Sequence, residues 1–129
     1  GIARELNQQG LEIVKSVTQG ADPALPALAP VFAIETALKQ SGLTIAQISQ
    51  VELMEAYAAQ ALACMKSCAI DPDKTNLKGG ALARGHPIGA SGAILAVRLF
   101  HDLRHKKGKL GLAAIAAAGG LGSAIILQS

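Results

Sequence analysis

Aromatic residues, long apolar runs and cysteines are scarce in this chain of 129 residues, and each scarcity excludes a class of protein. Tryptophan is absent, and there are only two phenylalanines and one tyrosine. No apolar run reaches the roughly 18–20 residues that cross a bilayer. The two cysteines, Cys64 and Cys68, are too few for a disulfide framework. The sequence therefore fits neither a membrane-spanning protein nor a disulfide-rich one.

Charge is also sparse, at 16% of residues, whereas half of the residues are apolar. A disordered chain shows the opposite balance, because it has too little apolar surface to offset the loss of chain entropy. The 14 glycines have no period, which excludes a collagen-like chain. What remains is a globular domain with a core of small residues. The length suits one domain, covering residues 1–129, and not two.

The net charge of +3 comes from a local cluster of basic residues between His101 and Lys109. One interpretation is a helix C-terminus, where the dipole favours cations and Gly108 ends the helix. The other is a patch that binds nucleic acid or another anion. We favour the first interpretation, because no aromatic residues alternate with the cations to stack on bases. We therefore expect no nucleic-acid partner.

The pattern of apolar residues predicts strands that alternate with helices. The predicted strands are 11–18, 50–55, 75–77, 110–118 and 121–128, and the predicted helices are 31–41, 56–69 and a third from Gly92 to about His105. Pro30 and Gly42 mark the two ends of the first helix. The order β-α-β-α-β-α-β-β predicts an α/β fold with a mixed five-stranded sheet and helices on both faces.

The third predicted helix is apolar around most of its circumference. Its polar stripe is narrow and consists of Ser91, Arg98, Asp102 and His105. A helix of this kind has to be buried on two sides, and a sheet of this size buries only one. We therefore expect a second molecule or domain to cover the other side.

One histidine stands out, because Gly85-His86-Pro87 is expected where a strand passes into the third helix. Proline at the first helical position is preorganised, and the helix dipole would keep the His86 imidazole neutral. A neutral imidazole is what a general base requires. A structural or solvent-exposed histidine would fit the same pattern. The spacing alone leaves both interpretations open.

The segment 76–92, NLKGGALARGHPIGASG, closely resembles the thiolase signature N-x-N-G-G-A-x-A-x-G-H-P-x-G-x-S/T-G. Upstream, VELMEAYAAQ (51–60) resembles the V-E-x-N-E-A-F-A segment of that family. Downstream, residues 111–124 resemble its terminal G-L-x-x-x-C-x-G-G-G-x-G stretch. The resemblance covers essentially the whole chain, but it matches only the C-terminal half of a thiolase subunit.

The resemblance implies reversible acyl transfer between a 3-ketoacyl-CoA and CoA by Claisen chemistry. In thiolases a nucleophilic cysteine from the N-terminal half holds the acyl group, and the histidine of the G-H-P motif activates it. The asparagine of N-E-A-F fixes a water that completes an oxyanion hole with this histidine. The C-x-G cysteine is an acid/base, and the glycine two residues later supplies a second oxyanion hole.

Compared with that pattern, this chain keeps one catalytic group and lacks three. His86 matches the family histidine. Met54 stands at the asparagine position, Ala116 at the cysteine position and Ala118 at the glycine position. A methyl group cannot transfer a proton, and a thioether is a poor anchor for water. The resemblance therefore implies a degenerate active site.

Other positions bear on ligands. Lys78 departs from the asparagine or histidine usual before the glycine pair, and Tyr57 fits the family aromatic, which lines a CoA channel or simply packs in the core. We expect a coenzyme A thioester as the family substrate, with no tightly bound cofactor and no metal. Cys64 and Cys68 lie one helical turn apart and are expected to be buried apolar side chains.

Three hypotheses follow. The chain is a catalytically silent thiolase half that serves binding or assembly, or a half-enzyme that needs a separate N-terminal half, or a truncated or decayed product. Independent thiolase activity is not expected under any of them. The expected partners are a thiolase N-terminal half or further copies of this chain across the third helix, and no membrane. No targeting segment is recognisable, so we expect a cytoplasmic location.

Overall fold

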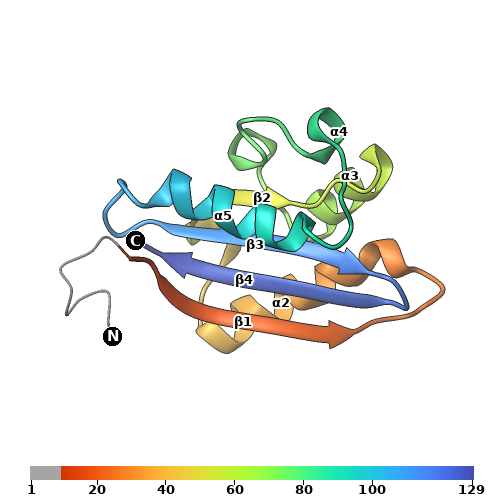
Figure 1. Cartoon of the computed structure of the whole chain (residues 1–129). Helices are drawn as coiled ribbons and strands as arrows, with labels where there is room; N and C mark the ends of the chain where they lie inside the picture. Colours follow the sequence, from red (N-terminus) through yellow and green to blue (C-terminus); the bar gives the residue numbers. More distant parts are fainter. Residues whose placement is uncertain (1–9) are drawn as a thin grey trace.

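The computed structural model describes residues 10–129, which form a mixed sheet with helices on both faces (Figure 1). The sheet has four strands in the order β1-β4-β3-β2. Strands β3 and β2 are parallel, and β4 pairs antiparallel with both β1 and β3. The strands are β1 (Glu12–Gly20), β2 (Ile48–Leu53), β3 (Leu110–Ala117) and β4 (Leu121–Gln128). The predicted α/β class and mixed sheet are confirmed.

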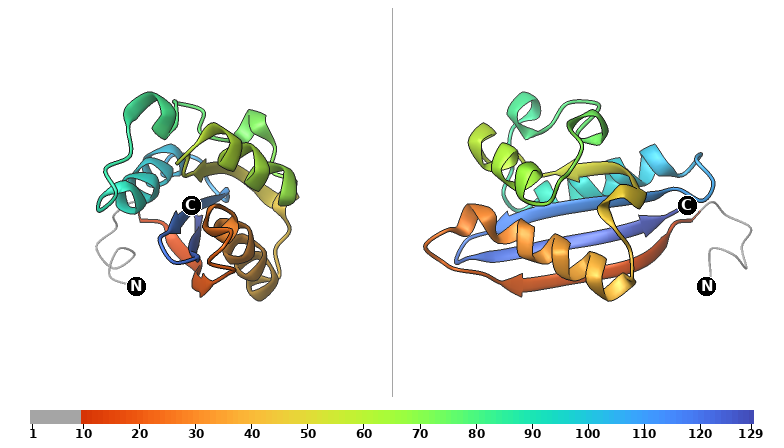
Figure 2. Two further views of the ribbon diagram at one scale, coloured as in Figure 1. Left: turned by 90° about the vertical axis from the view of Figure 1, so that its right-hand side faces the viewer. Right: turned by 180° about the vertical axis from the view of Figure 1, so that it is seen from behind.

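The helices are α2 (Ala29–Ser41), α3 (Ala58–Ser67), α4 (Ala81–Arg84) and α5 (Ser91–Leu103). Three short 3-10 turns cover Pro26–Leu28, Ile45–Gln47 and Pro72–Lys74. Helices α2 and α3 pack on one face of the sheet, and α5 lies on the other (Figure 2). The segment that connects β2 to β3 contains α3, α4 and α5, and α5 packs against both of these parallel strands.

Helix α2 begins and ends near its predicted limits. It starts two residues before Val31, and Pro30 lies in its first turn, where a missing N–H costs nothing. Gly42 ends the helix in the left-handed conformation, with φ of 69°, and its N–H bonds to the carbonyls of Leu38 and Lys39. The buried face includes Val31 and Ile34, as expected for a helix that covers a sheet.

The fifth strand expected at 75–77 is absent from the described residues, so that part of the prediction is wrong. Thr75 makes only an isolated parallel bridge with Val51. Asn76 has φ of 50°, which no strand residue adopts, and its side chain pairs with the backbone of Leu53 instead. A side chain thus occupies the edge of β2 where a strand backbone was expected.

The core consists of two apolar clusters, one on each face of the sheet. The cluster under α2 and α3 includes the fully buried Ile34, Leu53, Leu112 and Ile126. The cluster under α5 includes Leu95, Leu99, Leu103 and Leu127. Gly111 on β3 allows this close approach, because a Cβ there would lie 2.6 Å from side-chain atoms of Leu99 and Leu103.

Helix α5 buries only one side, and this side includes polar residues. Ser91 and Asp102 are buried beneath the helix together with the three leucines. Val97 on the opposite side is 55% exposed, and Ala93 is also exposed. The described part of the chain therefore leaves an apolar side of α5 uncovered. No helix in that part is long and apolar enough to cross a membrane.

Candidate functional site

The residues singled out by the sequence lie at the end of the sheet where β2 and β3 terminate. These two strands are parallel neighbours, so their carboxyl ends share one edge. Met54 follows β2 directly, and its N–H bonds to the carbonyl of Ala114 on β3 at 2.9 Å. Ala116 lies two residues further along β3. The segment before α5, which contains His86, reaches the same end (Figure 1).

Met54 is buried in an apolar environment. Only 3% of this residue is exposed, and it belongs to the cluster with Ala81, Leu95 and Leu99. These neighbours offer its side chain no hydrogen-bonding group. A thioether is a poor hydrogen-bond acceptor, so the Met54 side chain itself gives a bound water no strong anchor.

Ala116 and Ala118 flank the end of β3. Ala116 is half-buried and pairs with Gly122 on β4, and Ala118 is exposed in the turn between the strands. Ala118 does not have a positive φ, so its Cβ causes no left-handed strain. The turn is made by Gly119 and Gly120, with φ of 80° and 79°, conformations that L-residues with a Cβ rarely adopt.

His86 lies on an exposed loop rather than at a helix start. Helix α5 begins at Ser91, so Pro87 is not its first residue as predicted, and residues 88–90 form a turn. The N–H groups of Ala90 and Ser91 both bond to the carbonyl of Pro87 at 2.9 Å. The His86 Nδ1 lies 2.6 Å from the Ser91 hydroxyl. The histidine is thus held by the first residue of α5 and not by the helix dipole alone.

The loop before His86 is fixed to the end of β2 by two polar side chains. The Asn76 amide bonds to the N–H and the carbonyl of Leu53 at 2.9 Å, and donates to Glu55 at 2.6 Å. The second oxygen of Glu55 accepts the N–H of Leu82 at 3.0 Å, near the start of the short helix α4. A Cβ on Gly80 would overlap the Glu55 carboxylate. Helix α4 has no counterpart among the predicted elements, and its first turn is held by this carboxylate, which is distant in sequence.

A polar network beneath α5 joins this helix to β2. Glu52 is fully buried and accepts hydrogen bonds from Arg98 Nε at 2.8 Å and Nη2 at 3.4 Å. The hydrogen bond with Glu52 raises the pKa of Arg98. Asp102 accepts from Lys78 and from Gln50. Lys78, which departs from the family pattern, thus serves as a counter-ion for a buried carboxylate.

Cys64 lies on α3, and Cys68 directly follows this helix. Burial raises the pKa of Cys64, and burial together with the negative charge of Glu35 raises the pKa of Cys68 to about 12. Thiols with such pKa values carry almost no thiolate at neutral pH. Cys64 is in the core cluster beneath α2 and α3, and Cys68 packs against it. The expectation of a buried apolar side chain is met by Cys64, whereas Cys68 is only half-buried.

Tyr57 is 68% exposed at the start of α3, just beyond the end of β2. It is therefore not a core residue, and the packing interpretation of this aromatic does not hold. Its position leaves the side chain free to contact a ligand. Its role toward coenzyme A stays a prediction.

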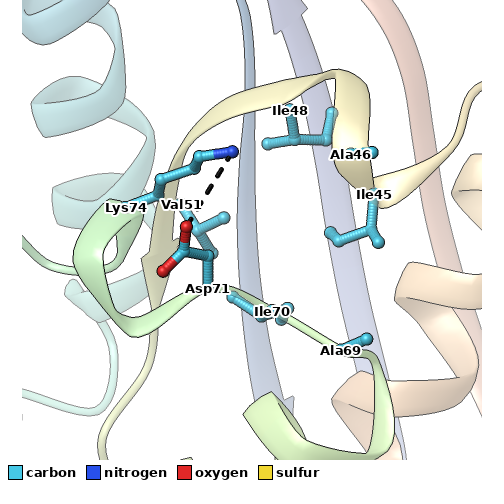
Figure 3. A pocket seen from close by; sticks show the side chains of 8 residues that line it. All are labelled: Ile45, Ala46, Ile48, Val51, Ala69, Ile70, Asp71 and Lys74. Carbon is cyan, nitrogen blue, oxygen red and sulfur yellow. Dashed lines mark ion pairs between the residues drawn. The ribbon is translucent and has the colours of Figure 1, made fainter.

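A small cavity lies away from these residues, toward the start of β2 (Figure 3). Its volume is about 120 Å³, and it is lined by Ile45, Ala46, Ile48, Val51, Ala69, Ile70, Asp71 and Lys74. Asp71 and Lys74 form an exposed ion pair of 4.0 Å at its rim. The cavity is smaller than the roughly 300 Å³ at which ligand sites usually begin. Across residues 10–129, no three side chains are grouped to hold a metal ion.

Three residues that hold the loop around His86 in place were not predicted as site residues: Ser91, Glu55 and Asn76. Each acts on a residue five or more positions away in the sequence. The signal available for Ser91 was its position in the signature, where thiolases have serine or threonine. Glu55 and Asn76 also stand at motif positions, the glutamate of N-E-A-F and the first asparagine of N-x-N-G-G. Their contacts could not be derived from the motif, because they depend on how the loop folds against β2.

Comparisons with known proteins identify the family of this chain. Residues 8–129 match the family model of the thiolase C-terminal domain. Human mitochondrial 3-ketoacyl-CoA thiolase is 43% identical over 117 residues, which are 91% of this chain and 30% of that protein.

Two solved structures are similar in fold. The Acat5 thiolase of Ascaris suum in complex with coenzyme A superposes with a TM-score of 0.92 and 37% identity, over 99% of this chain and 33% of that one. The peroxisomal 3-ketoacyl-CoA thiolase of Saccharomyces cerevisiae superposes with a TM-score of 0.90 and 35% identity, over 98% of this chain and 36% of that one. That structure is described as five-layered and built from two core domains of identical topology. This chain thus spans about a third of the length of its relatives. It belongs to the thiolase family of acyltransferases, as a thiolase C-terminal domain.

Proposed function

We propose that this chain is a thiolase half that has kept the fold and the histidine loop but does not catalyse acyl transfer by itself. The observation that carries the proposal is the burial of Met54 in an apolar cluster, where the thiolase signature has a water-binding asparagine. Ala116 likewise provides no group for proton transfer at the α-carbon of a substrate. Loss of one general acid or base typically lowers a rate by about 10²–10⁴.

The substrate class that we propose is a coenzyme A thioester. It is supported by the family and by the relative from Ascaris suum that was solved with coenzyme A. Tyr57 supports it weakly, since its exposed ring lies at the end of the sheet where Met54 and Ala116 are found. We propose no tightly bound cofactor. The cytoplasmic location stays a prediction.

The partner that we propose is a thiolase N-terminal half, which would cover the exposed side of α5. Three facts support it: the outer side of this helix is apolar, the chain spans about a third of its relatives, and the yeast relative contains two core domains. Exposed apolar helix surface of this kind is typical of an interface. A second copy of this chain is the alternative occupant.

A thiolysis assay tests the loss of activity. We expect the purified chain to cleave no acetoacetyl-CoA when CoA is added, followed by the absorbance of the substrate. CoA-dependent thiolysis that disappears in a His86→Ala variant would overturn the proposal. Thiolysis that persists in this variant would come from a contaminating enzyme, which further purification removes before the assay is repeated.

The second candidate function is a half-enzyme completed by a separate N-terminal half, and the intact His86 loop favours it. Its test combines Met54→Asn, Ala116→Cys and Ala118→Gly in one chain and adds the N-terminal half of a thiolase. Activity in the restored complex, lost again with His86→Ala, would support a half-enzyme ancestor. A stable complex without activity would exclude this function and leave assembly as the role of the chain.

A further inference from the structure

The hydroxyl of Ser91 lies between two groups near the start of α5. It is 2.6 Å from Nδ1 of His86 and 3.0 Å from the carbonyl oxygen of Pro87. Ser91 is 3% exposed, so water does not readily replace either contact. A hydroxyl carries one proton and can donate it to only one of these partners.

The two possible arrangements differ in the number of hydrogen bonds. If Ser91 donates to the Pro87 carbonyl, its oxygen is free to accept a hydrogen bond from the Nδ1–H group of His86, and both contacts are hydrogen bonds. If Ser91 donates to Nδ1, the contact with the Pro87 carbonyl is lost and the buried serine oxygen accepts nothing. The first arrangement makes one more hydrogen bond at the same two contacts, and donation by a helical serine to the carbonyl four residues earlier is a common local pattern, so the first arrangement is favoured.

We infer that Ser91 is a positioning residue that holds His86 in the tautomer protonated on Nδ1. A neutral imidazole has a single ring proton, so the lone pair is then on Nε2. This leaves Nε2 as the atom of His86 that can take a proton. The use of this atom as a base depends on the proposed function, whereas the tautomer itself does not.

Nitrogen-15 NMR of the histidine ring in the full chain tests this inference without any activity. The His86 signals are assigned by their loss in His86→Gln, and spectra are recorded at a pH where the ring is neutral. We expect the pattern of a ring protonated on Nδ1 in the wild-type chain. The pattern of a ring protonated on Nε2 would overturn the inference.

Variants separate positioning from a general effect on the fold. Ser91→Ala should shift the ring away from the Nδ1-protonated form, and Ser91→Thr should retain it because it keeps the hydroxyl. Ser41→Ala is the matched control, since Ser41 also donates to the carbonyl four residues earlier, at 2.7 Å, but contacts the carbonyls of Ala37 and Leu38 rather than a histidine. An unchanged ring pattern in a folded Ser91→Ala chain would contradict the inference.

The restored complex with an N-terminal half distinguishes this inference from the proposed function. If the tautomer is as expected and the complex is inactive, the half-enzyme hypothesis fails and the positioning by Ser91 stands. If the complex is active and the ring is protonated on Nε2, the inference fails and the half-enzyme stands.

Discussion

Arg98 on the inner side of α5 donates two hydrogen bonds to the carboxylate of Glu52, which is fully buried on β2. The guanidinium also donates to the carbonyl of Gly79 at 2.9 Å, so one side chain joins the helix, the sheet and the loop. Its side chain is 19% exposed. The charged residues Arg98 and Asp102 thus lie on the side of α5 that packs against β2, and the opposite side is apolar.

Removing either member of this pair should destabilise the chain. Arg98→Met leaves an unpaired buried carboxylate, and we expect a loss of about 2–4 kcal/mol in the free energy of unfolding, below the full cost for a pair with no solvent access. Urea denaturation measures it. The double variant Glu52→Gln with Arg98→Met should recover part of the loss, since no buried charge remains. Strictly additive losses would show that the two side chains are not coupled.

A side chain at Gly80 should displace the Glu55 carboxylate and weaken the hydrogen bonds that it makes. A methyl group at this position would overlap the Glu55 carboxylate that holds the loop, so Gly80→Ala should cost about 1–3 kcal/mol. Gly89→Ala is the matched control, because a Cβ there meets no atom within 4 Å and its φ is not positive. We expect the control to change stability by less than about 0.5 kcal/mol. Equal effects of the two variants would contradict the described position of Glu55.

The stability of the chain should fall at high pH because of Cys68. Its pKa is raised from 9.0 to about 12, mainly by burial. The thiol in the unfolded chain therefore loses its proton at lower pH than in the folded chain. The stabilisation is complete below pH 9, and it is lost as the pH rises through 12.

The comparison with Cys68→Ala isolates this effect from the titration of lysines. Between pH 9 and 11 the free energy of unfolding should fall more steeply in the wild-type chain than in the variant, because only the wild-type chain has this titrating thiol. Denaturation in urea at fixed pH steps measures both slopes. Parallel slopes would place Cys68 in contact with solvent.

The outer side of α5 should mediate association. Val97→Glu places a charge on this exposed apolar side and should change the stability of the isolated chain by less than about 0.5 kcal/mol. It should nevertheless abolish the oligomer or the complex with an N-terminal half, as seen by native mass spectrometry. Leu62→Glu is the control, because Leu62 is 62% exposed on α3 and should leave association intact. A wild-type chain that stays monomeric and binds no N-terminal half would contradict this prediction.

The sequence by itself determined the order of the main elements. Apolar periodicity, Pro30 and Gly42 locate α2 within two residues, because local backbone preferences decide where a helix begins and ends. The glycine pair 119–120 likewise locates the turn between β3 and β4. The family resemblance, confirmed by the thiolase C-terminal domain match, depends on residues in sequence order. It also selected the segments that lie at one end of the sheet.

Only the tertiary structure decided what depends on contacts between distant residues. The sequence showed a narrow polar stripe on α5, but only the fold revealed that Arg98 and Asp102 pair with β2, and that Ser91 is buried against the preceding loop. The expected strand at 75–77 became a single bridge, because the Asn76 side chain bonds to the β2 backbone. The local pattern predicts that apolar residues are buried and that charged residues are exposed. Glu52 is an exception, because a carboxylate can be buried where a partner such as Arg98 reaches it in the folded chain.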